Sequence, residues 1–150
     1  MLQKYRVVRE LGKGAFGVVF LCEGSVDKGT YVVKQVDGLR EDRLSLTELR
    51  VMFQLNHQNI VPLLDFYCNK HVLYIVMEYC PSGDLRQHLL EHYLLRARKV
   101  PEETALSWFT QLCMAVDFAH RQGVLHRDLK PSNIFLFEKV VVLILLCGFF

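Results

Sequence analysis

The sequence has no long hydrophobic run, no closely paired cysteines and little net charge. Its longest apolar stretch, at 140–150, is shorter than the roughly 20 residues of a membrane helix, and its first residues lack the apolar core of a signal peptide. The five cysteines form no Cys-x-x-Cys pair, which argues against a zinc site or a disulfide framework. A net charge of +2 gives no reason to expect nucleic acid or a membrane as partner. We therefore expect a protein of a reducing compartment, cytoplasmic or nuclear.

The overall composition is that of a folded domain. Hydrophobic residues make up 51% of the 150 positions and charged residues 23%, which excludes a disordered tail. The first half has β-branched and aromatic runs between turn residues, which predict strands at 5–11, 18–22, 31–36, 61–67 and 73–80. A helix is expected between the third and fourth of these strands, because apolar residues recur there at helical spacing.

The second half has the pattern of helices. Asp84 can cap a helix that runs toward Arg96 and Arg98, and a second helix is expected to open at Pro101 and to end at Gly123. The apolar residues assigned to the inner face of this second helix are Ala105, Trp108, Phe109, Leu112, Val116 and Ala119. His88 and His92 stand four residues apart and could hold a metal, but without a third ligand nearby we interpret them as part of a solvated face.

A glycine-rich segment joins the first two predicted strands. Gly12, Gly14 and Gly17 have the spacing Gly-x-Gly-x-x-Gly, and a strand beginning at Val18 follows them. A dinucleotide-binding turn would need a helix at that point, so the order strand, loop, strand favours a hairpin that lies over phosphates. Glycines let backbone N–H groups approach phosphate oxygens closely. The alternative is an ordinary hairpin turn that needs glycines for its backbone.

Two further stretches combine charge with apolar neighbours. Lys34 alternates with Val33 along the third strand and shares a face with Val32, so it is either an edge-strand lysine or a partly buried cation with an anionic partner. The segment 124–136 places His, Arg, Asp, Lys and Asn in a polar loop between apolar runs. Taken alone, its Arg and Asp could form a solvated surface pair of little energetic value.

In this order and spacing, the motifs resemble those of eukaryotic serine/threonine protein kinases, most closely the NIMA-related group, over residues 4 to about 137. The resemblance implies an α+β, protein kinase-like fold. Residues 4–80 would form a five-stranded antiparallel N-lobe with one αC-type helix and the hinge, 81–137 the start of a helical C-lobe, and 138–150 a divergent apolar tail. Within 1–150 the kinase domain would thus be partial.

The resemblance also assigns the site. Asp128 would accept the proton of a Ser or Thr hydroxyl on a protein substrate, Lys130 would steady the transferring phosphoryl group, and Asn133 would hold Mg²⁺. Glu48 would pair with Lys34, although Ser45-Leu46-Thr47-Glu48 also has the spacing of a capping box. The residues that would contact ATP are Leu11, Gly12, Lys13, Gly14, Ala15, Phe16, Gly17, Val18, Val19, Val32, Lys34, Glu48, Met77, Glu78, Cys80 and Phe135.

After Leu136 the sequence departs from the family. The expected Asp-Phe-Gly falls on Leu146, Cys147 and Gly148, so the aspartate that binds magnesium in kinases is replaced by leucine. We therefore expect weak or no catalysis from this chain, with a pseudokinase-like module that binds nucleotide or a partner as the alternative. We also expect a truncated product of a longer kinase, and an aggregation-prone strand within 140–150.

Overall fold

The computed structural model describes residues 4–14, 17–37, 53–69, 71–137 and 141–144. The chain forms two compact units, which we describe separately. The sheet unit comprises the chain up to Gln54 together with Pro62–Tyr79, and the helical unit comprises Leu55–Val61 together with Cys80–Gly148. Within the described residues, none of the helices combines the length and the apolar character that a bilayer crossing requires.

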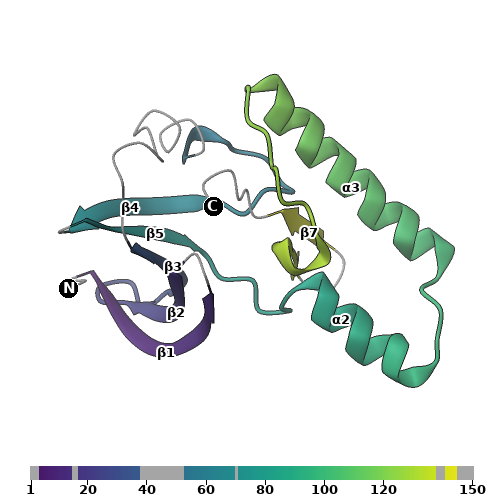
Figure 1. The fold of residues 1–150 in the computed structure, drawn as a ribbon, viewed down its shortest axis with the longest axis horizontal. Helices are drawn as coiled ribbons and strands as arrows, with labels where there is room; N and C mark the ends of the chain where they lie inside the picture. The colour runs from purple at the N-terminus through teal and green to yellow at the C-terminus, as the bar shows by residue number, and fades with distance from the viewer. Residues whose placement is uncertain (1–3, 15–16, 38–52, 70, 138–140, 145–150) are drawn as a thin grey trace. The chain divides into compact units, whose positions relative to one another are not determined.

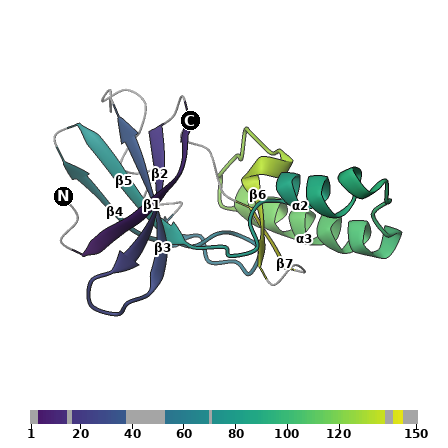
Figure 2. The same ribbon diagram turned by 90° about the horizontal axis from the view of Figure 1, so that it is seen from below.

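The sheet unit is built on five antiparallel strands. They are β1 (Tyr5–Gly14), β2 (Gly17–Gly24), β3 (Thr30–Asp37), β4 (Leu63–Asn69) and β5 (Val72–Glu78). Their order in the sheet is β1-β2-β3-β5-β4, and Figure 2 shows them as one twisted sheet. The five predicted strands are therefore confirmed. They form because β-branched and aromatic residues suit a pleated, half-buried surface.

One face of this sheet holds a small closed core. Cys22, Val33 and Val76 lie there without exposed surface, and Phe20, Tyr5 and other tyrosines pack around them. The rings of Tyr67 and Tyr74 stack with centroids 4.9 Å apart. Burial raises the pKa of the Cys22 thiol, so the thiol stays protonated in this apolar setting. The core depends on strand alternation, which sends every second side chain to this face.

The helical unit begins with a short helix, α2 (Leu85–His92), labelled in Figure 1. Asp84 caps it as predicted, since its Oδ1 accepts a hydrogen bond of 2.8 Å from the backbone N–H of Gln87. The predicted extension toward Arg98 is wrong. The helix stops at His92, a 3₁₀ turn follows at Leu94–Arg96, and Ala97 adopts a left-handed conformation with φ of 51°.

The long helix α3 (Glu102–Arg121) follows and matches its predicted start and end closely. Pro101 is its N-cap, acidic residues fill its first turn, and the N–H of Gly123 bonds the carbonyl of His120 just beyond its end. Its buried residues are Trp108, Ala115 and Ala119. The predicted inner face was therefore partly wrong, because Ala105 and Phe109 are exposed.

A hairpin completes the helical unit. Strands β6 (Ile134–Phe137) and β7 (Val141–Ile144) pair antiparallel, with Ile134 opposite Ile144, and lie beside α2 and α3. The N–H of Leu136 donates to the carbonyl of Gly83, which ties the hairpin to the start of α2. The described part of the tail predicted at 138–150 is thus a strand that pairs with β6.

Candidate active site

The face of the sheet opposite the Cys22 core gathers several predicted nucleotide contacts. Val19 of β2 and Ile75 of β5 lie directly opposite Lys34 on either side of β3. Val32, two positions earlier on β3, lies opposite Met77. Residues opposite each other in antiparallel strands share a face, so Val19, Val32, Lys34 and Met77 project from one surface. Lys34 is half-buried among them rather than at a sheet edge, because β3 is an inner strand.

The glycine hairpin between β1 and β2 depends on one glycine more than on the others. Gly17 has a φ of +123°, and a Cβ placed on it would lie 1.8 Å from the carbonyl oxygen of Gln35. A Cβ on Gly12 or Gly14 would meet no described atom within 4 Å. Gly17 is therefore required for β2 to approach β3, whereas Gly12 and Gly14 leave open space above their backbone. Ala15 and Phe16 lie outside the described residues.

The helix predicted to carry Glu48 lies mostly outside the described residues. Its last described residues, Phe53 and Gln54, are helical. The ring of Phe53 contacts that of Phe66 edge-on, with centroids 5.9 Å apart, and Phe66 pairs with Ile75 in the sheet. The end of this helix therefore packs on the same sheet face as Lys34. The Lys34–Glu48 ion pair stays a prediction.

The polar loop 126–133 is anchored by a histidine that was not among the predicted site residues. The backbone N–H of Asp128 donates to the carbonyl of His126 at 2.9 Å and to its Nδ1 at 3.3 Å. The imidazole is buried, and Arg127 between them takes a left-handed φ of 63°. This tight turn fixes the backbone of Asp128. The sequence signal for this role was the position of His126, two residues before Asp128 in the His-Arg-Asp segment.

Three side chains of the loop converge. The ammonium of Lys130 lies 2.7 Å from Oδ2 of Asp128, and the Asn133 amide nitrogen donates to the same oxygen at 3.0 Å and to the Asp128 carbonyl at 2.8 Å. The hydrogen bond from Lys130, assisted by the one from Asn133, lowers the pKa of the Asp128 carboxyl, although partial burial opposes this. Asp128 is therefore an ionised acceptor at neutral pH.

The remaining predicted contacts are spread over both units. Leu11, Lys13 and Val18 belong to the glycine hairpin. At the end of β5 the N–H of Glu78 bonds the carbonyl of Pro62, and Cys80 begins the helical unit as a buried residue. Phe135 lies on β6 next to Asp84. Because Phe135 belongs to the helical unit, its predicted contact with the same nucleotide as Val19 and Val32 stays a prediction.

The loop offers a modest donor set for a divalent cation. The Asn133 nitrogen is engaged by Asp128, so its carbonyl oxygen is the atom left to face a cation, and Mg²⁺ prefers such oxygen ligands. Among the described residues, no cluster of three or more His, Cys, Asp or Glu side chains could hold a metal. Mg²⁺ is usually held by only one or two carboxylates together with water and substrate phosphates, so the loop fits a shared cation.

Comparison with known proteins identifies this arrangement. The family model described as protein kinase domain matches residues 5–149. The chain belongs to the protein kinase domain family. The matched range includes the segment after Leu136, where the motif resemblance was expected to end. The fold agrees: a solved kinase-fold structure, "Crystal structure of Rad53 1-466 in complex with AMP-PNP", matches with a TM-score of 0.84 and 30% identity over 96% of this chain and 38% of that one.

The most similar curated relatives include kinases of the NIMA-related group. This kinase chain is 36% identical to "Serine/threonine-protein kinase Nek3" of Mus musculus over 136 residues, which are 90% of this chain and 26% of the relative. It is 32% identical to "Serine/threonine-protein kinase Nek5" of Homo sapiens, covering 94% of this chain and 20% of the relative. The family predicted from the motifs is confirmed. The chain spans about a quarter or less of the length of these relatives.

Proposed function

We propose that the chain carries the nucleotide and catalytic elements of a serine/threonine protein kinase, which transfers the γ-phosphoryl group of ATP to a Ser or Thr hydroxyl of a protein. The observation that carries the proposal is the convergence of Lys130 and Asn133 on the ionised Asp128 carboxylate. Two independent facts support ATP as the nucleotide: the Rad53 match is a complex with AMP-PNP, and Lys34 shares a sheet face with Val19 and Met77.

In this mechanism the loop residues act on both ends of the new bond. The Asp128 carboxylate accepts a hydrogen bond from the attacking hydroxyl and takes up its proton. The ammonium of Lys130, 2.7 Å from that carboxylate, places positive charge where the phosphoryl group arrives. His126 has a positioning role. Its Nδ1 accepts a hydrogen bond from the Asp128 N–H, and this bond holds the turn that orients the carboxylate.

The nucleotide would be held from the sheet unit. Lys34 would contact phosphate oxygens, the backbone of the glycine hairpin would cover them, and Val19, Val32 and Met77 would enclose the adenine. When bound, Mg²⁺ would neutralise charge on the phosphates, and Asn133 would face it through its amide oxygen. We further propose that turnover is low, because Leu146, outside the described residues, replaces the aspartate that kinases use for this cation.

Thermal unfolding in the presence of nucleotide tests the binding part. Ligands that bind the folded state raise the midpoint of unfolding. We expect ATP to raise the midpoint, Mg²⁺ to increase that shift only slightly, and Lys34→Met to remove most of it. A chain whose midpoint is unaffected by ATP, with and without Mg²⁺, would contradict the nucleotide site.

Phosphate transfer tests the chemistry. Incubation of purified chain with labelled ATP and a Ser/Thr-containing protein substrate should give slow transfer that falls about 100-fold or more in Asp128→Asn, the usual cost of losing a general base. A chain that binds ATP but transfers no phosphate, in wild type and variant alike, favours the second candidate, a nucleotide-binding module without catalysis. The replacement of the metal-binding aspartate by Leu146 is the specific observation that favours it.

A further inference from the structure

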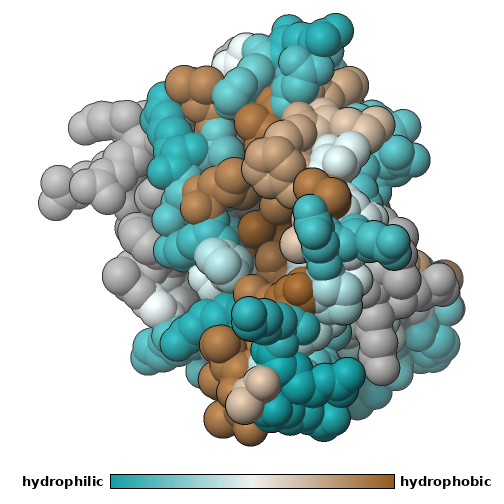
Figure 3. Space-filling view, turned by 90° about the vertical axis from the view of Figure 1, so that its right-hand side faces the viewer, coloured by the Kyte–Doolittle hydropathy of each residue, from teal (hydrophilic) through white to brown (hydrophobic). Residues whose placement is uncertain are grey.

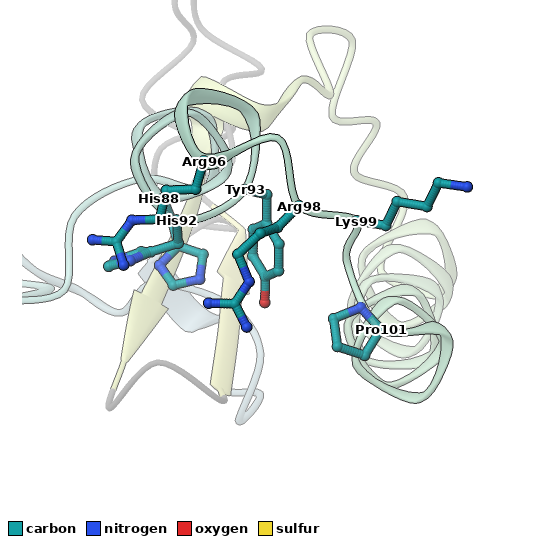
Figure 4. Close-up of a pocket in the computed structure, with 7 residues that line it drawn as sticks. All are labelled: His88, His92, Tyr93, Arg96, Arg98, Lys99 and Pro101. Atoms are coloured by element: carbon teal, nitrogen blue, oxygen red, sulfur yellow. The ribbon is translucent and has the colours of Figure 1, made fainter.

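A small pocket in the helical unit lies outside the catalytic loop and has no place in the mechanism above. Its volume is about 280 Å³. Figure 4 shows it where α2 ends and the chain turns toward α3. The residues that line it are His88, His92, Tyr93, Arg96, Arg98, Lys99 and Pro101. Five of these seven side chains carry or can acquire positive charge, and none can become negative at neutral pH.

Arg96, Arg98 and Lys99 are the permanent cations of this pocket, and all three are exposed residues. Within the part of the chain that the structure describes, no acidic side chain forms an ion pair with Arg96, Arg98 or Lys99. The acids nearest in sequence to these three cations are Glu102 and Glu103, in the first turn of α3, and Glu91, at the end of α2. Glu91 uses its Oε1 to accept a hydrogen bond of 2.7 Å from Gln87. Clustered cations repel one another, so an anion that enters the pocket relieves a cost already present in the folded chain.

The backbone holds the arginines in place. The Nε of Arg96 donates to the carbonyl of Glu91 at 3.1 Å, and so caps the end of α2, where carbonyl dipoles would otherwise oppose an anion. The N–H of Arg98 donates to the carbonyl of Tyr93 at 2.9 Å across the left-handed turn at Ala97. In Figure 4 the guanidinium of Arg98 reaches toward the histidines, whereas the ammonium of Lys99 points away from them.

The two histidines add oriented donors. Their rings lie 4.5 Å apart on successive turns of α2, and the ring of His88 packs edge-on against buried Trp108 at 5.7 Å. This packing makes them half-buried rather than the solvated pair that the sequence suggested. An imidazole has a ring N–H group that can donate a hydrogen bond to an anion.

We propose that this pocket binds the phosphate group of a phosphorylated serine or threonine in a protein chain. Arginine pairs with phosphate through two parallel hydrogen bonds, and a phosphorylated side chain offers three acceptor oxygens with nearly two negative charges. The volume of 280 Å³ lies just below the roughly 300–1,000 Å³ of typical ligand pockets, so it suits one side chain better than a nucleotide.

The surroundings favour a peptide as the carrier of that phosphate. Leu94 and Leu95 belong to the same turn as the arginines and are 70% and 72% exposed. They offer apolar contacts to residues that flank a phosphorylated one. The site therefore acts as a docking point for a phosphorylated segment, and it does not depend on whether the chain transfers phosphate.

The proposal can be tested by calorimetric titration of the full 150-residue chain. The two ligands are a phosphoserine peptide and the same peptide without the phosphate. The phosphorylated form should bind at least about tenfold tighter, in line with a charge-assisted hydrogen bond, and salt should weaken it. Arg98→Gln should remove that preference. Arg86→Gln removes the same charge from an exposed position of α2 that does not line the pocket, and should keep the preference. Asp128→Asn should keep it as well.

Chemical-shift mapping on the unaltered chain provides a measurement that no folding defect can confuse. The phosphopeptide should shift the resonances of His88, His92 and Arg98 more than those of the catalytic loop. Equal affinity for the two peptides overturns the proposal. Equal losses in Arg98→Gln and Arg86→Gln overturn it too, because they mean diffuse attraction. Binding of inorganic phosphate without any preference for the phosphopeptide also overturns it.

Discussion

In the sheet unit Cys22, Val33 and Val76 have no exposed surface, whereas in the helical unit the ring of Phe109, beside buried Trp108, is 64% exposed. Figure 3 shows hydrophobic side chains at the surface among hydrophilic ones. The large exposed apolar residues of α3 are Leu106, Phe109 and Met114. The core of the sheet unit is thus enclosed by residues of its own strands. The helical unit is stabilised partly by the buried residues of α3 and partly by the hydrogen bonds and ion pair of the catalytic loop.

The two units position their predicted site residues in different ways. The sheet positions Lys34 by register, so its accuracy follows from strand pairing and a closed core. The helical unit positions Asp128 by local hydrogen bonds: its backbone N–H donates to His126, and its carboxylate accepts from Lys130 and Asn133. Core substitutions should therefore act on the folding of the sheet, whereas loop substitutions should act on chemistry with little effect on folding.

The largest effect is expected within α3, from Trp108→Ala. Removing a buried Trp side chain should lower the free energy of unfolding by about 3–5 kcal/mol, whereas Phe109→Ala, one residue along, should change it by less than about 0.5 kcal/mol. Urea unfolding followed by circular dichroism measures both. Equal losses would mean that the face bearing Phe109 is covered, and would end the contrast between the two units.

The next effect concerns the glycine hairpin. Gly17→Ala combines a φ of +123° with a clash against the Gln35 carbonyl, and should cost about 3 kcal/mol or more. Gly12→Ala, with open space at its Cβ, serves as the control and should cost far less. Thermal unfolding measures the two. A mild Gly17 variant would show that β2 can move away from β3 at little cost.

A smaller effect is expected in the core of the sheet unit. Val76→Ala removes two buried methyl groups and should lower the free energy of unfolding by about 2 kcal/mol. Val26→Ala is the matched control, because Val26 is 94% exposed in a turn, and it should leave stability unchanged. A Val76 variant as stable as the Val26 variant would show that the core is loosely packed.

The smallest effect is on the titration of Asp128. Lys130→Ala removes the main cause of its lowered pKa, so the pKa should rise, as a carbon-detected NMR titration of the carboxyl would show. The sign for stability follows: a depressed folded pKa stabilises the fold above the ordinary Asp value of about 4 and ceases to do so as pH falls through the depressed value. Arg121→Ala, which breaks only the pair with Asp117, should leave the Asp128 titration unchanged.

The sequence allowed the sheet to be predicted well and the helices less well. Strands have a period of two, so Val33 could be assigned to the face opposite Val32 and Lys34 without knowing the fold. On α3 several adjacent apolar residues fit a helical stripe about equally. Only packing distinguishes Trp108 from Phe109, because the buried stripe depends on what lies against the helix. The end of α2 was missed because neither Gly nor Pro marks the turn at Ala97.

The site was predictable where it is local. Asp128, Lys130 and Asn133 lie within six positions, so their convergence follows from one short loop. The anchoring by His126 could not be read from spacing alone, since it depends on the left-handed backbone of Arg127. The pocket at the end of α2 was also missed, because His88 and His92 were interpreted as a solvated face and the helix was expected to continue toward Arg96 and Arg98.

Because Cys22 is fully buried, its reaction with a thiol reagent can report on the opening of the sheet. Cys68 and Cys113 are exposed and should react with a thiol reagent at once, whereas the Cys22 sulfur becomes reachable only when the strands around it separate. Cys80 is buried as well but belongs to the helical unit, so mass spectrometry must follow the Cys22 peptide by itself. The rate of alkylation at Cys22 would then time the opening of the sheet under native conditions, with and without ATP.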